Sequence, residues 1–214
     1  MKNVIKGFRS PTIFVLLAVL ALHASLPRFS QAQTETVTSP NGTISVTFEL
    51  AGSTPTYAVS RAGVPIIERS RLGVVLRDAA PLTAGLSVAG VERSDHNEVW
   101  EQVWGETARV RDHHREMRIT LEEPGVPNPR TMVVVFRVFD DGVGFRYEWP
   151  SQPHLNEFII EEEVTEFSFA HDNATWWIPA FERQRYEHIY TRDPISRLGR
   201  VHTPLTMETP DGLY

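Results

Sequence analysis

Carboxylates offer the first candidate chemistry in this sequence. Glu161, Glu162 and Glu163 are consecutive, and Glu166 follows closely. Glycoside hydrolysis needs two carboxyl groups at a defined separation across a sugar. Adjacent residues of a strand point to opposite faces, and a charge run between apolar segments is typical of a solvated strand edge. We therefore expect a solvated edge here and name no catalytic residue.

Histidine spacing gives little support for a metal centre. His113 and His114 are adjacent and so diverge in a strand or a turn. The other histidines after residue 32 show no i,i+4 pair of the kind that binds metal from a helix; they are His96, His154, His171, His188 and His202. Zinc is not expected from this spacing. The absence of Cys also excludes thiol catalysis, thiolate zinc sites and disulfides.

Tryptophan is frequent for a chain of 214 residues. Flat indole rings could stack on sugar faces, but Trp also dominates buried contacts in cores and between domains. We favour packing for the five tryptophans, which are Trp100, Trp104, Trp149, Trp176 and Trp177.

The elements that must position these side chains are strands. Alternation of apolar and polar residues is clearest in Thr43–Leu50, where four apolar side chains share one face. Glu182–Tyr190 is the best short helical candidate, although it also fits a loop. Further strands are expected at 56–60, 64–67, 73–77, 86–91, 108–110, 116–122, 131–139, 144–149, 157–160 and 166–169. Short strands separated by Gly, Pro, Asn and Asp turns predict an all-β sandwich.

The first 32 residues have the pattern of a secretory signal peptide. Lys2, Lys6 and Arg9 precede an apolar run over 12–24, and Ser30-Gln31-Ala32 offers a small-x-small cleavage site. Cleavage after Ala32 leaves 17 cationic and 27 acidic side chains, a net charge of −10, which argues against nucleic acid as a partner. We expect one exported domain over residues 33–214, periplasmic or secreted.

Several segments, in order along residues 36–214, resemble the N-terminal domain of glycoside hydrolase family 97, the family of the periplasmic α-glucosidase of bacterial starch utilisation. Together they are more specific than any one of them. They are Thr38–Gly42, Ser70–Val74, Trp104–Glu106, Phe136–Pro150, Trp176–Pro179, Tyr186-Glu187 and Asp211–Tyr214.

The resemblance implies a large two-sheet β-sandwich, similar to galactose mutarotase, that precedes a (β/α)8 barrel. In the family the barrel supplies the catalytic carboxylates, so no residue of this sequence inherits a catalytic role. Because Asp211–Tyr214 resembles a turn that opens another strand, we expect a fragment of a longer chain, without the barrel and the last strands of the sandwich. The resemblance also implies one calcium ligand at Glu187, with Glu182 as the competing assignment, for a calcium ion shared with the barrel.

Two functional hypotheses follow. In the first, the chain is the leading domain of an exported calcium-dependent α-glucosidase or α-galactosidase that acts on α-linked oligosaccharides. In the second, it is a carbohydrate-binding or structural sandwich without catalytic activity. The sequence does not distinguish glucosidase from galactosidase, or a retaining from an inverting enzyme, because those properties depend on barrel carboxylates.

Overall fold

A computed structural model describes residues 33–182 and 186–212. The predicted signal peptide, residues 1–32, lies outside the described residues. Within the described ranges no helix is long and apolar enough to cross a membrane. Apart from the single 3-10 turn η1 (Ile195–Arg197), the regular structure of these ranges consists of β-strands.

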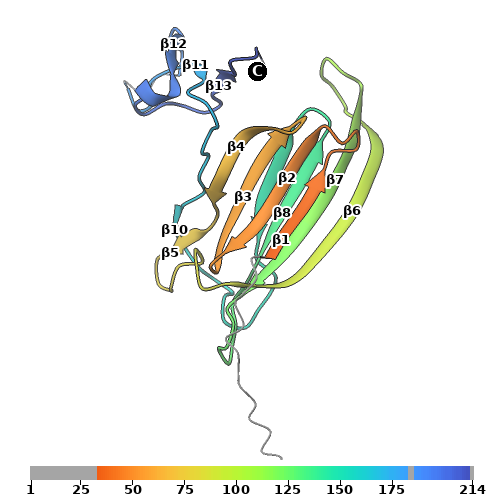
Figure 1. Ribbon diagram of the computed structural model, residues 1–214, viewed down its shortest axis with the longest axis vertical. Coiled ribbons are helices and arrows are strands. Elements are labelled where there is room, and N and C mark those ends of the chain that lie inside the picture. The colour runs from red at the N-terminus through yellow and green to blue at the C-terminus, as the bar shows by residue number, and fades with distance from the viewer. Residues whose placement is uncertain (1–32, 183–185, 213–214) are drawn as a thin grey trace, which may run out of the picture. The chain divides into compact units, whose positions relative to one another are not determined.

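Two four-stranded antiparallel sheets form the sandwich (Figure 1). The first sheet has the order β1-β2-β3-β4 and consists of β1 (Gln33–Thr38), β2 (Ile44–Ala51), β3 (Thr54–Arg61) and β4 (Val64–Arg71). The second has the order β6-β7-β8-β9 and consists of β6 (Ser87–Glu101), β7 (Arg109–Glu122), β8 (Thr131–Phe139) and β9 (Val143–Glu148). Each strand therefore pairs with its sequence neighbours, as expected where short turns connect antiparallel strands.

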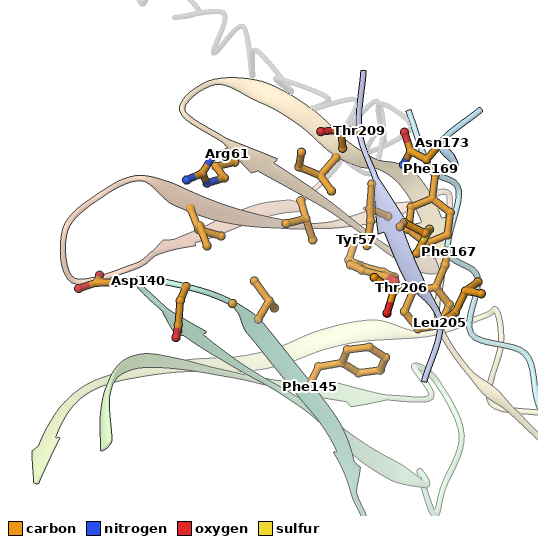
Figure 2. A pocket seen from close by; sticks show the side chains of 18 residues that line it. Tyr57, Arg61, Asp140, Phe145, Phe167, Phe169, Asn173, Leu205, Thr206 and Thr209 are labelled. Carbon is orange, nitrogen blue, oxygen red and sulfur yellow. The ribbon is translucent and has the colours of Figure 1, made fainter. Parts of the chain in front are cut away.

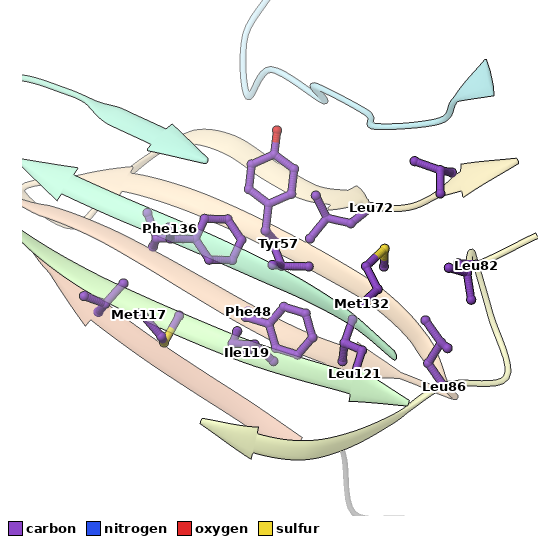
Figure 3. Close-up of a cluster of buried hydrophobic side chains, with 14 of the residues drawn as sticks. Phe48, Tyr57, Leu72, Leu82, Leu86, Met117, Ile119, Leu121, Met132 and Phe136 are labelled. Carbon is purple, nitrogen blue, oxygen red and sulfur yellow. The ribbon is translucent and has the colours of Figure 1, made fainter. Parts of the chain in front are cut away.

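The core lies between these two sheets. Val46 and Phe48 of β2 are alternate residues and fully buried, and Ile119 and Leu121 of β7 are fully buried in the same way. Figure 3 shows Phe48, Ile119 and Leu121 together between the layers. This is the one-sided burial that alternation predicted, because successive strand side chains point to opposite faces. The all-β sandwich is confirmed.

Two smaller sheets complete the described chain. β5 (Val74–Leu76) pairs with β10 (Ile160–Glu163). β11 (Ala174–Trp177) lies between β12 (Thr191–Pro194) and β13 (Thr206–Glu208), and η1 follows β12.

Some predicted boundaries were wrong. A single strand, β7, replaces the two expected at 108–110 and 116–122, because its polar residues 111–115 pair continuously with β6. The segment 166–169 contributes one bridge, between Phe169 and Ile67, in place of a strand. No helix forms over the described part of Glu182–Tyr190. β1 and β11 to β13 were not anticipated.

Candidate functional site

The loop after β11 carries both predicted calcium ligands. Its base is fixed by main-chain hydrogen bonds, from Ala180 N to Arg200 O at 2.9 Å and from His202 N to Ile178 O at 3.1 Å. Side chains hold β11 to β12 as well, since Trp177 Nε1 donates to Asp193 Oδ2 at 3.1 Å. The loop therefore starts from a firmly paired strand.

Glu187 is exposed on this loop. Within the described ranges its carboxylate has no hydrogen bond or ion pair. Its neighbour Tyr186 is anchored, because the Tyr186 hydroxyl donates to Thr203 O at 3.2 Å and its ring lies 5.2 Å from that of His202. Glu187 thus sits beside an anchored residue with both oxygens free.

Glu182 is exposed as well, and no side chain in the described part of the protein pairs with it. Residues 183–185, between the two candidates, lie outside the described residues. The geometry therefore leaves both assignments open.

Large apolar residues lie next to the two glutamates in the sequence, and their side chains face solvent. Phe181 is 83% exposed and Ile189 is 93% exposed, and Tyr190 is half-exposed. Large apolar residues clustered on a surface mark an interaction site more often than isolated ones do. We call Phe181, Tyr186, Ile189 and Tyr190 the apolar loop surface.

A cavity of about 700 Å³ opens beside the sandwich (Figure 2). Tyr57 and Phe145 come from the two sheets, Phe167 from the segment after β10, and Leu205 from the residue before β13. The Tyr57 hydroxyl donates to Glu166 O at 2.8 Å, and burial raises the pKa of this phenol well above its ordinary value. Tyr57 therefore contributes a neutral phenol to the wall of the cavity.

Polar side chains also line this cavity, among them Arg61, Asn173 and Thr206. Asp140 and Asp141 are its lining acids among the described residues, and they are adjacent on the β8–β9 turn. Asp140 Oδ1 is occupied by the main-chain N–H of Asn41 at 2.8 Å. Two neighbouring carboxylates on one turn do not face each other across a sugar, so we assign no hydrolytic pair of carboxylates to this cavity.

The run Glu161–Glu163 lies on β10 and is exposed, as predicted for a solvated edge. Glu166 instead forms an ion pair, with Arg71 Nε donating to Glu166 Oε1 at 2.7 Å. The Arg71 guanidinium lowers the pKa of the Glu166 carboxyl. These glutamates have structural or solvated positions.

His113 and His114 diverge, as predicted: His114 is buried and His113 is half-buried. Cross-strand pairing, however, places His96 directly opposite His114, with the two rings stacked at 4.6 Å. Spacing along the chain missed this contact, because it depends on the register of β6 against β7. A search for histidines at opposite positions of a possible hairpin could have found it.

The tryptophans divide between packing and exposure. Trp149 packs against Phe158 at 5.1 Å, and Trp176 lies under the Arg192 guanidinium at 5.2 Å. Trp100 is half-exposed and Trp104 is 88% exposed, at the tip of the β6–β7 hairpin. Packing is therefore confirmed for Trp149 and Trp176, whereas Trp100 and Trp104 lie outside the core, and packing between domains stays a prediction for them.

Comparison with known proteins gives one consistent result. Residues 37–214 match the family described as "Glycosyl-hydrolase 97 N-terminal". A protein of Streptomyces bingchenggensis (strain BCW-1), described as "Probable retaining alpha-galactosidase", is 31% identical over 199 residues, which is 88% of this chain and 29% of that protein.

Solved structures agree. A Glycoside Hydrolase Family 97 enzyme from Pseudoalteromonas sp. strain K8, in complex with acarbose, is 38% identical with a TM-score of 0.78, covering 83% of this chain and 27% of that one. A variant of this kind of enzyme from the same strain, in complex with panose, matches equally well. A beta-arabinopyranosidase is 26% identical with a TM-score of 0.62, covering 69% of this chain and 23% of its own. The chain spans less than a third of the proteins it matches.

Proposed function

The chain belongs to glycoside hydrolase family 97, through its N-terminal domain, and on that premise we propose that it is the leading sandwich of an exported, calcium-dependent α-glycosidase. The observation that carries this proposal is the family match over residues 37–214. The proposed substrates are α-linked oligosaccharides, because relatives were solved with panose and acarbose. An α-galactosidase among the relatives keeps α-galactosides as an alternative to α-glucosides.

In this proposal the domain supplies one calcium ligand, Glu187, to an active site that a (β/α)8 barrel otherwise builds. Calcium takes six to eight oxygen ligands, and one carboxylate supplies at most two of them. The exposed Glu187 carboxylate, free of protein partners within the described ranges, has both oxygens available. The remaining ligands must come from the barrel, which supports a shared site.

The apolar loop surface supports the same arrangement. Phe181 and Ile189 flank the two candidate ligands in sequence and face solvent. Contact of this surface with the barrel would remove apolar area from water and bring Glu187 to the barrel rim. Docking and calcium ligation are therefore one event in this proposal.

Export is the second part of the proposal. The basic start of the chain, the apolar run over 12–24 and the Ser30-Gln31-Ala32 site support secretion with cleavage before Gln33. A chain without Cys is compatible with either a periplasmic or a secreted product, because it needs no disulfide for folding.

The test uses the full-length protein that contains this domain, with Glu187→Gln and Glu182→Gln compared in parallel. We expect Glu187→Gln to reduce calcium affinity and hydrolysis of p-nitrophenyl α-glycosides together, and Glu182→Gln to change neither. Glu162→Gln, on the exposed β10 edge, is the matched control. The opposite ranking would move the ligand to Glu182. Full calcium-dependent activity in both variants would show that neither glutamate binds the calcium ion. Absence of hydrolysis in the parent protein would favour a non-catalytic sandwich.

A further inference from the structure

The sheet register gathers three potential metal ligands on β6 and β7. His96 of β6 faces His114 of β7, and Glu116 follows two residues later on the same face of β7. One ligand atom from each of these side chains lies within 4.8 Å of the other two. The group is separate from the cavity and from the loop that carries Glu187.

One ring nitrogen of His114 has a hydrogen-bond partner in the described residues and the other has none. Its side chain is 1% exposed, and its Nδ1 contacts Asp112 Oδ1. Since a carboxylate only accepts hydrogen bonds, this contact assigns the proton to Nδ1 and leaves a lone pair on Nε2. That Nε2 is buried and has no hydrogen-bond partner in the described structure. A buried polar atom without a partner is costly, which indicates that something absent from the protein chain satisfies it.

Glu116 contributes a carboxylate oxygen to the same group of ligand atoms. Its side chain is buried, and Arg137 Nε donates to its Oε2 at 2.8 Å. Arg118 lies 3.7 Å from Oε1, which is beyond hydrogen-bond distance. The guanidiniums of Arg137, Arg118 and Arg146 lie around the Glu116 carboxylate, and no group in the described residues donates a hydrogen bond to Oε1, which leaves this oxygen available.

The neighbouring arginines are themselves largely paired. Arg118 binds Glu148 Oε2 at 2.5 Å, and Arg146 Nε donates to Glu148 Oε1 at 2.7 Å. Their repulsion of a bound cation is therefore offset by Glu148, with Asp112 as a further nearby anion. The local field does not exclude a divalent ion.

We propose that His96, His114 and Glu116 form a binding site for Zn²⁺, with solvent in the fourth position. Two imidazoles and one carboxylate form a donor set that zinc accepts, whereas Ca²⁺ and Mg²⁺ prefer oxygen alone. Asp112 occupies the position of the outer carboxylate that commonly orients a zinc-bound histidine. The Asp112 carboxylate thus already orients the ring of His114, the most buried of the three residues.

Zinc binding requires the three ligand atoms to move closer together. Ligands about 2.0 Å from zinc in a tetrahedral site lie about 3.3 Å from one another, which is closer than the 4.8 Å limit of the present group. His96 is the ligand free to adjust, because it is only half-buried and its one hydrogen-bond partner is Ser94 Oγ at 3.2 Å. Rotation of His96 would exchange the ring stack for a shared ion.

A bound ion would link the edge strand of this sheet to its neighbour. β6 is the outermost strand of its sheet and pairs with β7 alone. An ion held by one β6 ligand and two β7 ligands would tie this edge strand to its neighbour and oppose opening of the hairpin. Zinc would therefore stabilise the fold.

The test measures Zn²⁺ binding by calorimetry on the full chain without a histidine tag, together with thermal unfolding and the visible spectrum of the Co²⁺ form. We expect one equivalent of Zn²⁺ to bind and raise Tm, and the Co²⁺ form to show the intense absorption of a tetrahedral site. His96→Ala should weaken binding at least tenfold. Asp112→Asn should weaken it by about 10–100-fold, the usual cost of losing a carboxylate that orients a metal-bound histidine.

His113→Ala is the matched control, since its side chain points away from the site on the same strand. Equal loss in the His113 and His96 variants, or an octahedral Co²⁺ spectrum, would show adventitious surface binding and overturn the proposal. Absence of binding to the parent chain at near-millimolar Zn²⁺ would do the same. Because His96 is half-buried, its variant should keep the unfolding profile of the metal-free parent, which separates lost affinity from lost folding.

Discussion

Arg130 holds both carboxylate oxygens of Glu123. Its Nε donates to Oε2 at 2.8 Å and a terminal nitrogen donates to Oε1 at 2.5 Å, while the other terminal nitrogen reaches Ala80 O at 2.7 Å. The guanidinium side chain is only 11% exposed. This fork joins the two ends of the β7–β8 connection to the segment before β6, and a planar, bidentate pair is the strong form of such contacts.

Loss of the Glu123 charge should therefore destabilise the fold. Glu123→Gln leaves a nearly buried guanidinium without its anion, and we expect a loss of about 1.5–3 kcal/mol in the free energy of unfolding at pH 7. Urea denaturation measures it. Glu162→Gln, an exposed change on β10, should alter stability by less than about 0.5 kcal/mol.

The same pair predicts a pH dependence. Arg130 lowers the pKa of the Glu123 carboxyl in the folded state below its ordinary value of 4.5. A group whose pKa falls on folding stabilises the protein above its unfolded pKa, and this contribution disappears as pH falls through the folded pKa. The stability difference between the parent and Glu123→Gln should thus be constant above about pH 5.5 and shrink in acid. A difference that grows below pH 4.5 would contradict the assignment.

Gly73 occupies a position that no other residue can take without strain. Its φ is +143°, and a Cβ there would lie 2.6 Å from Leu82 O, a main-chain atom. Gly73→Ala should lower the free energy of unfolding by more than about 2 kcal/mol. Gly90→Ala is the control, because its Cβ would meet nothing within 4 Å. Similar melting temperatures of the two variants would show that the main chain at Gly73 and Leu82 can move apart enough to accept a Cβ.

Cleavage of the leader is tested directly. Mass spectrometry of the exported protein should find Gln33 at the N-terminus, since the small residues Ser30 and Ala32 occupy the −3 and −1 positions of the expected site. Ala32→Arg should block processing and retain the precursor. An intact Met1 on membrane-bound parent protein would contradict export with cleavage.

Local pattern predicted the sandwich strands well and their long-range partners poorly. β8 matches its expected range of 131–139, and β2 begins within one residue of it, because one-sided burial repeats every second residue. β11 was missed, since four residues containing two tryptophans and pairing with segments far along the chain show no period.

The candidate sites likewise depend on features that local sequence pattern does not predict. Glu187 is proposed as a calcium ligand on the resemblance alone, and it lies exposed on a loop that no periodicity describes. His96 and His114 are far apart in sequence, and their contact follows only from the β6–β7 register. A one-residue change in that register would place the two rings on opposite faces, so chain spacing alone could not predict the pair.

Substitution by Ala should change the stability of the domain by very different amounts at Phe48 and at Phe181. Phe48 is fully buried in β2 between the two sheets, whereas Phe181 is 83% exposed on the apolar loop surface. Phe48→Ala removes a ring from a close-packed core and should lower the free energy of unfolding by about 3–5 kcal/mol. Phe181→Ala removes a largely exposed ring whose centroid lies 6.2 Å from that of His202, and it should change the stability of this chain by less than about 0.5 kcal/mol. In our proposal this surface contacts the barrel of the full-length enzyme and positions Glu187, so Phe181→Ala should there weaken docking of the loop and reduce calcium affinity. Comparing urea denaturation of the 214-residue chain with calcium titration of the full-length protein separates the two effects.

Two results would contradict this prediction. A large loss of stability in the 214-residue chain would show that Phe181 packs within the domain. Unchanged calcium affinity in the full-length protein would place the contact with the barrel elsewhere.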